Sequence, residues 1–455
     1  MSTPSHQGRV IVVGAGIAGL AAGYRLHTQG FDVTVLEKAD FLGGRMRTIH
    51  HGGYTLDLCA VYLSDSYRHM RELVAETGIE GQTRPASDRV GVLREGHTHY
   101  LSLSSKTALA TTRLLTWTSK LKALRLALDV TRAGKHLNWG DATAAAALDT
   151  ESAHAYAQRR VGEEIHDYLL DALCAHHFGR STRDTSKAAA FYVVNALLGH
   201  GGFNFTDGID TLAHALARPL TVHTQAHVHQ VEEHPDRVHV TWNSADGTEH
   251  VADAAACVVA VPAPAAQAML PQLTPAQKTY LSGITYAPLL PIYLGLHQPP
   301  SEDAFATFVS GNEDPHLIAV TYGHNIAPTR TPADKALAGL YFRDNWTTPR
   351  WNLDDTTLAD QALTQLAHLM PDLAKHCRTH LDMTYVHRAA EAVVTREPGS
   401  LGQLADFTRS LAPRSRIALA GDYLSFSTTN AALATGEHAA TRIHALGLLP
   451  TTAST

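Results

Sequence analysis

The sequence predicts an α/β protein in which a parallel sheet is joined to a second, largely helical domain that also contains a β-sheet. Three observations predict this fold. The chain has 455 residues, which at about 150 residues per domain corresponds to two or three domains. Residues 9–30 have the pattern of a buried strand, a glycine-rich turn and a helix. Residues 417–442 show a buried strand and a helix again, near the other end of the sequence.

Composition restricts the class of protein. The chain is 44% hydrophobic and 18% charged with a net charge of -6, which excludes a disordered acidic chain and a strongly basic nucleic-acid binder. We therefore expect small-molecule partners. Residues 1–9 lack the pattern of a signal peptide, and no apolar run approaches the roughly 18 residues of a membrane span. A cytoplasmic protein is expected, and contact with a membrane surface stays open.

The histidines and cysteines do not predict a metal site. The 29 histidines are scattered, and none of their groupings has the spacing of a metal motif. The tightest groupings are His97/His99, His176/His177 and His227/His229. The four cysteines are far apart and form no C-x-x-C pair, so we expect reduced thiols. They are Cys59, Cys174, Cys257 and Cys377.

The first chemical signal is a strand, turn and helix. Residues 9–14 form an apolar run typical of a strand buried on both faces of a parallel sheet. In the turn that follows, Gly14 permits a tight bend, Gly16 lets the backbone approach a pyrophosphate, and Gly19 lets the helix pack close to the strand. The pattern predicts a dinucleotide at the amino end of the helix. An empty structural turn is the alternative.

A second strand supplies an acidic residue at the required distance. Residues 31–36 predict a second strand, which runs into Glu37, where the acid of a dinucleotide fold accepts the ribose hydroxyls. A 2′-phosphate would be repelled there. These residues alone leave NAD and FAD as alternatives.

Residues 38–48 distinguish these cofactors through a family resemblance. Lys38-Ala-Asp-Phe-Leu-Gly43-Gly44-Arg45-Met-Arg-Thr48 follows the acid, and residues 9–48 together resemble the flavin-containing amine oxidase superfamily. That group includes protoporphyrinogen oxidases and phytoene-type desaturases. The resemblance implies a Rossmann-type FAD-binding domain like that of glutathione reductase. It also assigns FAD contacts to Ala18, Lys38, Gly43, Gly44 and Arg45.

Residues 54–62 resemble the family's Asp-Leu-Gly segment, which passes beside the flavin ring. Cys59 stands where the family usually has glycine. We interpret it as a small buried side chain rather than a reactive thiol. Tyr62 is a candidate for substrate contact, with a packed core ring as the alternative.

The other end of the chain carries a second match. Residues 417–423 form a buried strand that runs into Gly421 and Asp422, and this resembles the family's C-terminal FAD signature. The resemblance places the Gly-Asp step at the ribityl-phosphate. It points the amino end of the next helix, at Asn430-Ala431-Ala432, toward the flavin pyrimidine ring, where a positive helix end favours reduced, anionic flavin. Because no cysteine lies near the Gly-Asp step, we expect non-covalent FAD.

Between these matches, a helix is predicted over residues 211–217. Three alternating runs then predict a β-meander: 221–228, 237–242 and 249–251. The resemblance assigns Val228 to bracket adenine through its backbone. Residues 257–261 predict a returning buried strand.

The resemblance makes the FAD-binding domain discontinuous. It is strong over residues 9–75, 200–300 and 415–445. The FAD-binding domain is assigned residues 1–80, 205–280 and 400–455. The substrate domain is assigned residues 81–204 and 281–399.

A helix in the poorly matched middle has an apolar stripe and several cations. The stripe consists of Trp117, Leu121, Leu124 and Leu128 at helical spacing, and we expect it to pack on the domain. Residues 106–135 carry seven basic side chains and one acidic side chain. The basic residues are Lys106, Arg113, Lys120, Lys122, Arg125, Arg132 and Lys135. We favour a solvated helix face, with an anionic substrate or a membrane surface as alternative partners.

A few positions separate the subfamilies. Many amine oxidases hold a water at flavin N5 with a lysine, and the aligned residue here is Pro291. They also flank the amine with two aromatic rings. The residues just before the Pro398-Gly399 turn and the aligned Thr428 are not aromatic, but Tyr423 or Phe426 could supply a ring from a neighbouring position. For His176 and His177 we favour surface positions, with proton transfer to a heterocycle as the alternative.

The sequence therefore predicts an FAD-dependent oxidase or desaturase that removes a hydride from a C–C or C–N unit of a cyclic or apolar metabolite. Dioxygen is the expected electron acceptor, although the sequence does not exclude another one, and it leaves the oligomeric state open. The alternatives are an amine oxidase that yields an imine, an isomerase that uses reduced flavin, and an escort protein resembling the GDP-dissociation inhibitors.

Overall fold

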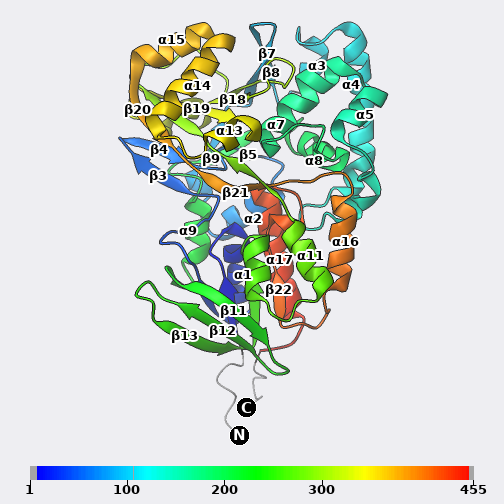
Figure 1. The fold of residues 1–455 in the computed structure, drawn as a ribbon, viewed down its shortest axis with the longest axis vertical. Helices are drawn as coiled ribbons and strands as arrows, with labels where there is room; N and C mark the ends of the chain where they lie inside the picture. The colour runs from blue at the N-terminus through cyan, green and yellow to red at the C-terminus, as the bar shows by residue number, and fades with distance from the viewer. Residues whose placement is uncertain (1–7, 106, 450–455) are drawn as a thin grey trace.

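A computed structural model describes residues 8–105 and 107–449, and its fold is built on a five-stranded parallel sheet (Figure 1). The strand order is β10-β2-β1-β14-β22. The strands are β1 (Arg9–Val13), β2 (Asp32–Leu36), β10 (Thr221–His223), β14 (Ala256–Val259) and β22 (Ile417–Leu419). Strands from both ends and the middle of the chain meet in one sheet, which confirms the predicted α/β fold.

Alternating side chains of β1 build the two layers that cover this sheet. Val10 and Val12 pack against helices, whereas Ile11 and Val13 pack against an antiparallel sheet and a second group of helices. The helices of the first layer, which contact Val10 and Val12, are α1 (Ile17–Thr28), α2 (Arg68–Glu76), α9 (Thr211–Ala217) and α17 (Thr429–His444). The second layer consists of β11 (His227–Glu233), β12 (Val238–Asn243), β13 (Glu249–Ala254), α10 (Ala263–Met269), α11 (Pro275–Gly283) and α16 (Ser400–Ser410).

The predicted strand over residues 221–228 is divided in two. Gln225 has a φ of 55°, and this left-handed residue turns the chain between β10 and β11. Strand β10 joins the parallel sheet and β11 begins the meander. The alternation of the sequence continues through the turn, which is why it predicted one strand.

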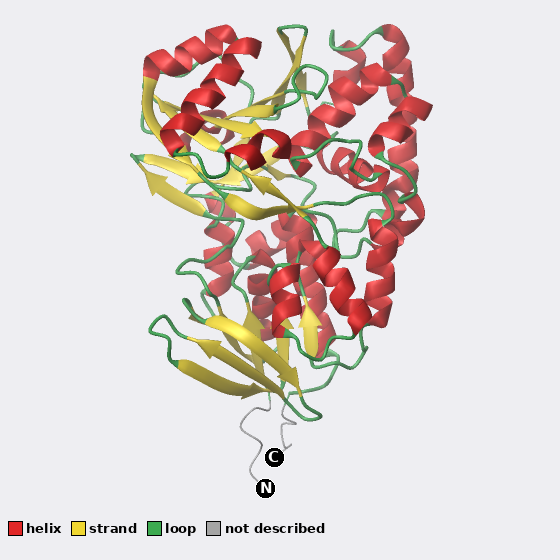
Figure 2. Cartoon of the chain, viewed as in Figure 1, coloured by secondary structure: helices red, strands yellow, loops and turns green. Residues whose placement is uncertain are grey.

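The upper part of the molecule in Figure 2 contains a seven-stranded mixed sheet. Its order is β20-β16-β19-β18-β17-β7-β8, and β7 and β17 form its parallel pair. The strands are β7 (Arg89–Arg94), β8 (His97–Ser102), β16 (Ile292–Leu296), β17 (Ala306–Phe308), β18 (Leu317–Tyr322), β19 (Ala336–Phe342) and β20 (Leu381–Val386).

Helices cover both faces of this second sheet. One face packs against α13 (Asp344–Arg350), α14 (Asp355–Leu369) and α15 (Pro371–His380). The other face packs against the helical middle of the chain. Its elements are α3 (Ala108–Thr111), α4 (Trp117–Ala133), α5 (Ala153–Arg160), α6 (Glu163–Ile165), η4 (His166–Asp171), α7 (Ala172–Phe178) and α8 (Lys187–Leu197).

Short elements connect the two parts. The strand pairs are β3 (Thr48–His51) with β4 (Tyr54–Asp57), and β15 (Tyr286–Leu289) with β21 (Ala389–Val394). A third small sheet has β5 (Leu63–Ser64), β9 (Gly202–Phe205) and β6 (Thr83–Ala86). Short helices are α12 (Gly323–Ile326), η1 (Glu80–Gln82), η2 (Gly134–His136), η3 (Thr143–Leu148), η5 (Pro328–Arg330) and η6 (Asp422–Leu424). Across the described ranges, no helix has the length and apolar character needed to traverse a bilayer.

Helix α4 corrects one prediction. Its apolar stripe faces solvent, and the buried face carries mostly smaller side chains, which pack toward α8 and α6. The exposed fractions are 78% for Trp117, 67% for Leu121, 65% for Leu124 and 46% for Leu128. The buried residues are Ser119, Ala123, Leu126, Val130 and Ala133. Small side chains let helix backbones approach, so they and not the stripe define the packed face. Lys106 lies outside the described residues.

Candidate functional site

The turn between β1 and α1 forms an open cradle. Gly14 has a φ of +100°, and a Cβ there would lie 2.7 Å from the carbonyl oxygen of Ala260. A Cβ on Gly19 would lie 2.0 Å from the carbonyl oxygen of Gly14, so the helix packs directly on the turn. At Gly16, by contrast, a Cβ would meet no described atom within 4 Å. The open space lies at the amino end of α1, where backbone N–H groups favour an anion.

Glu37 ends β2 beside this cradle. One carboxylate oxygen accepts the amide of Ala15 at 2.6 Å and the other accepts the amide of Ala39 at 2.8 Å. Each oxygen retains acceptor capacity for another donor, such as a ribose hydroxyl. The amide of Ala226 donates to the Glu37 carbonyl at 2.8 Å, which brings the start of β11 and the buried Val228 close to the same edge. Lys38 is exposed beside them.

The two glycines after β2 lie against the cradle. Gly43 and Gly44 have φ values of +91° and +58°, in the left-handed region that side chains disfavour. The Gly43 amide donates to the Ala15 carbonyl at 2.9 Å, and a Cβ on Gly44 would lie 3.2 Å from the Cα of Gly16. The two glycine motifs therefore form one backbone surface.

Arg45 and Asp422 come from opposite ends of the chain and meet at this surface. The guanidinium donates two hydrogen bonds to the carboxylate, both at 2.7 Å, and a third to the Ala392 carbonyl at 3.0 Å. The Ser427 hydroxyl also donates to Asp422, at 3.0 Å. The two charged groups largely satisfy one another, so their predicted contacts with FAD depend on the few remaining hydrogen-bonding positions and on backbone. Gly421 just before has its amide bound to the Thr435 hydroxyl at 2.9 Å.

The first turn of α17 contains a buried donor that fits a cofactor. Thr428 caps the helix by accepting the Ala431 amide at 2.9 Å. The Asn430 carbonyl oxygen accepts the Met70 amide at 3.0 Å, but its buried Nδ2 has no hydrogen-bond partner among the described residues. Ala431 and Ala432 are buried beside it. A buried unpaired donor is costly, and an acceptor such as a flavin carbonyl would satisfy it. Together with the open glycine cradle, this donor shows that the residues fit FAD.

A buried arginine that the sequence analysis did not identify holds the loop before α17. Arg396 donates to the carbonyl oxygens of Ser425 and Tyr423, each at 2.6 Å. These bonds fix the loop between the Gly-Asp step and the Thr428 cap. No pattern in the sequence signals this role, because the partners are backbone carbonyls far away in sequence.

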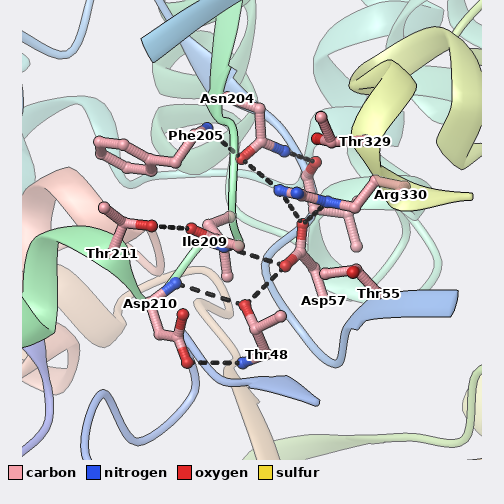
Figure 3. Close-up of polar contacts among 12 residues, drawn as sticks. Thr48, Thr55, Asp57, Asn204, Phe205, Ile209, Asp210, Thr211, Thr329 and Arg330 are labelled. Atoms are coloured by element: carbon pink, nitrogen blue, oxygen red, sulfur yellow. Dashed lines mark hydrogen bonds and ion pairs between the residues drawn. The ribbon is translucent and has the colours of Figure 1, made fainter. Parts of the chain in front are cut away.

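Asp57 anchors the segment expected beside the flavin ring (Figure 3). Its carboxylate accepts from the Nε of Arg330 at 2.9 Å, the Ile209 amide at 2.9 Å and the Thr48 hydroxyl at 2.8 Å. Asp57 and Arg330 are buried, and such a pair is costly to break on one side, at about 3–5 kcal/mol. The Arg330 guanidinium also donates to the Asn204 side chain at 3.2 Å. The network holds residues 57–59 against three neighbouring segments.

Tyr293 connects this segment to the upper part of the molecule. Its hydroxyl donates to the Asp57 carbonyl at 2.6 Å and lies 3.4 Å from the hydroxyl of Tyr341. Cys59, two residues after Asp57, is half-buried, and burial raises the pKa of its thiol to about 11. The thiol is protonated at pH 7, which fits its interpretation as a small neutral side chain.

The two histidines are only partly exposed and contact the interior of the molecule, which corrects the favoured surface interpretation. The His176 ring lies 4.8 Å from the ring of Phe308 and 5.9 Å from that of Tyr341. His177 Nε2 lies 2.8 Å from the Ser427 carbonyl oxygen and donates to it. Burial lowers the pKa of both histidines to about 4, so both are neutral at pH 7. Helix α7 carries them inward because it packs on the seven-stranded sheet.

Tyr62 lies on the same side of the site. Its ring stacks on that of Phe305 with centroids 4.2 Å apart and covers Gly202. Within the described ranges its buried hydroxyl has no hydrogen-bond partner, and the same is true of His176 Nδ1. Burial raises the pKa of Tyr62, so the hydroxyl stays protonated. Tyr62 and His176 thus offer two unsatisfied polar atoms within an aromatic wall formed with Phe305, Phe308 and Tyr341.

An aromatic ring lies close to the position aligned with an amine cage. Thr428 itself is a helix cap, whereas Phe426 is buried and stacks on Tyr192 with centroids 3.9 Å apart. Tyr192 in turn contacts Trp139 edge to face at 4.6 Å. Pro291 is buried between β15 and β16, and its carbonyl accepts the His387 amide at 3.1 Å.

A sequence profile of the family described as flavin containing amine oxidoreductase matches residues 17–444. The mitochondrial protoporphyrinogen oxidase of Nicotiana tabacum is 31% identical over 185 residues, which cover 40% of this chain and 35% of the relative. That match spans only about a third of the plant protein. The coproporphyrinogen III oxidase of Mycobacterium tuberculosis is 26% identical over 457 residues, covering 91% of this chain and 92% of the relative.

A solved structure shows the same fold. The cyclohexylamine oxidase of Brevibacterium oxydans superposes with a TM-score of 0.73 at 20% identity, covering 97% of this chain and 99% of that chain. At this identity the similarity establishes the fold alone.

Proposed function

Because the chain belongs to the flavin-containing amine oxidoreductase family, whose profile matches residues 17–444, we infer that it removes a hydride from a C–C or C–N unit of a cyclic or largely apolar metabolite. It binds FAD, and dioxygen is the proposed electron acceptor. The tobacco and mycobacterial relatives described above are named as porphyrinogen oxidases, which makes porphyrinogens the first substrate class to test.

The observation that carries this proposal is a neutral aromatic wall bonded to both cofactor segments. Tyr293 donates to the carbonyl of Asp57, in the segment expected beside the flavin ring. His177 donates to the carbonyl of Ser427, in the loop before α17. Between them lie the rings of Tyr341, His176 and Phe308. The wall has no charge at pH 7, and Asp57 is already paired with Arg330. The wall residues carry no carboxylate that could pair with an ammonium ion, so their broad apolar area suits a ring system better.

When bound, FAD supplies the hydride acceptor, the flavin N5 atom. The chain would hold FAD through the backbone surface formed by the two glycine motifs, through Glu37 and through the first turn of α17. Tyr293 and His177 fix the wall relative to these segments, so a substrate lying on it has a set distance and orientation. The hydroxyl of Tyr62 and Nδ1 of His176 each offer one hydrogen bond to a heteroatom. The rings of Phe305 and Phe308 exclude water from the reacting C–H bond.

Anaerobic bleaching of the visible absorption of bound flavin tests the proposal. One set of compounds contains primary and secondary amines, and the other contains cyclic alkenes, ketones and porphyrinogens. We expect bleaching by the second set. Bleaching by amines alone would establish an amine oxidase, with Phe426 and Tyr192 as the rings nearest its substrate.

Two further readouts test the remaining alternatives. A flavin-to-protein ratio near one excludes an escort protein that has lost its cofactor. An activity that needs prior reduction but consumes no oxidant would indicate an isomerase. Tyr62→Phe should lower kcat/KM about tenfold with unchanged flavin content. Tyr100→Phe, on the exposed β8, serves as its control.

A further inference from the structure

Helix α4 presents a continuous band of large apolar side chains to solvent. Four of the seven large hydrophobic residues that are exposed in the described part of the chain lie on this one helix. Trp117, Leu121, Leu124 and Leu128 recur every three or four residues and share a face. The buried set begins two positions later, at Ser119, which is about 200° around the helix. The apolar band therefore points directly away from the protein.

Cations flank the band. Lys120 lies on one side, with its ammonium 4.4 Å from the centre of the Trp117 ring. Arg125 and Arg132 follow the band on the other side at the helical spacing of seven residues, and both are exposed. Three more exposed cations, Arg113, Lys122 and Lys135, lie before, within and after the helix. These charges are concentrated here although the whole chain carries a net charge of -6.

The acidic residue of this helix is already paired. Asp129 accepts hydrogen bonds from Arg160 at 2.8 Å and from the Tyr156 hydroxyl at 2.9 Å, both on α5. Its charge is directed toward α5, so it does little to neutralise the exposed cations. At the other end, Thr116 caps the helix and donates to Glu164 at 2.6 Å. The helix is thus fixed at both ends with its apolar band outward, at the outer edge of the upper part in Figure 1.

We propose that this face of α4 docks the protein on the surface of an anionic lipid bilayer. An isolated apolar patch of this kind is unfavourable in water and marks an interaction surface. An apolar helix face flanked by lysine and arginine suits the boundary between acyl chains and anionic headgroups, where tryptophan is also favoured. A second copy of the chain fits less well, because pairing two such faces would bring their flanking cations together. The proposal is independent of the substrate assigned above.

Vesicle flotation tests the proposal on the full-length holoenzyme. We expect flotation with vesicles of phosphatidylcholine and phosphatidylglycerol, and much less with phosphatidylcholine alone. Raising salt from about 50 mM to about 500 mM should weaken binding, because it screens the cations. Leu121→Gln with Leu124→Gln should lower the bound fraction at least about tenfold. Arg125→Gln with Arg132→Gln should lower it for anionic vesicles specifically.

Matched controls separate docking from unfolding. Val251→Gln with Leu381→Gln removes two exposed apolar side chains elsewhere, on β13 and β20, and should leave flotation unchanged. The emission of Trp117 should shift to shorter wavelength on docking, and Trp117→Phe should remove that shift while retaining most binding. Flavin content of every variant reports that the fold is intact.

Two results would overturn the proposal. One is the absence of flotation with anionic vesicles by the wild-type holoenzyme. The other is a dimer in solution that Leu121→Gln with Leu124→Gln dissociates, which would assign the apolar band to a second copy of the chain.

Discussion

Helices α1 and α4 both carry apolar residues at helical spacing, but they bury different kinds of face. In α1 the large side chains Ile17, Leu20 and Leu26 are buried with the small ones. In α4 the large side chains are mostly exposed, and the buried face is dominated by small residues such as Ala123 and Ala133. An apolar stripe therefore gives the direction of a helix face but does not decide whether protein or another phase covers it. In both helices small residues lie on the packed face.

The largest expected effect tests the close contact of α1. A Cβ on Gly436 of α17 would lie 2.1 Å from the carbonyl oxygen of Ala18, which is backbone and cannot move aside. Gly436→Val should lower the free energy of unfolding by about 3 kcal/mol and remove most of the bound flavin. Urea unfolding and the flavin-to-protein ratio measure both. Gly402→Ala in α16 is the control, since a Cβ there meets no described atom within 4 Å, and it should be neutral or slightly stabilising.

The next effect tests the buried face of α4. Leu126 is the largest fully buried apolar side chain of that face, at 2% exposure. Leu126→Ala should lower the free energy of unfolding by about 2–3 kcal/mol through the cavity that it leaves. A loss below about 0.5 kcal/mol, measured by urea unfolding, would contradict the assignment of this face as the packed one.

A smaller effect comes from the histidines that α7 carries inward. Burial lowers the pKa of His176 and His177 to about 4 in the folded protein, below the ordinary value of about 6.5 in an unfolded chain. As pH falls below 6.5, the unfolded state binds more protons, so their contribution to stability declines toward pH 4. Between pH 7 and pH 5 we expect a loss of about 1–2 kcal/mol for each histidine.

Urea unfolding at these two pH values measures this loss. In His176→Gln with His177→Gln the pH-dependent loss should shrink by the sum of the two contributions. His97→Gln, on the exposed β8, is the control. An unchanged pH dependence in the double variant would show that the two rings are solvated in solution.

The smallest expected effect completes the comparison. Leu124 has the same side chain as Leu126 but is 65% exposed on the opposite face of α4. Leu124→Ala should change the free energy of unfolding by less than about 0.5 kcal/mol. A loss as large as that of Leu126→Ala would show that the apolar band packs against protein in solution.

The segments that carry the FAD motifs could be predicted from the sequence because their signals are local. The glycine turn, the following helix, Glu37 and the paired glycines at 43 and 44 lie within about 40 consecutive residues, and each needs a particular residue type for backbone reasons. The second cofactor segment, at Gly421 and Asp422, was also recognisable from adjacent residues. The structure confirms the fold that these segments predicted and brings the segments together. The individual FAD contacts assigned to them stay predictions.

The aromatic wall and the buried arginine networks depend on contacts between distant residues, which one sequence does not reveal. Arg330 pairs with Asp57, and Arg396 bonds to carbonyls of a loop that contains no charged partner for it. The inward position of His176 and His177 depends on how α7 packs against a sheet whose strands come from elsewhere in the chain. Nothing in the two-histidine motif itself indicates burial. For the same reason, Tyr293 and Tyr341 gave no local signal of their place at the site.

The order of strands in the parallel sheet has a consequence for how the protein is made. Strand β1 is translated about 400 residues before β22 and α17, which complete the sheet and cover α1. At about 5–20 residues per second this interval is roughly 20–80 seconds. Throughout that time the nascent chain lacks Asp422, the partner of Arg45, and Gly436, the contact of Ala18. We therefore expect flavin loading to be a late event, and we expect a chain arrested before β22 to expose its glycine cradle without holding the cofactor.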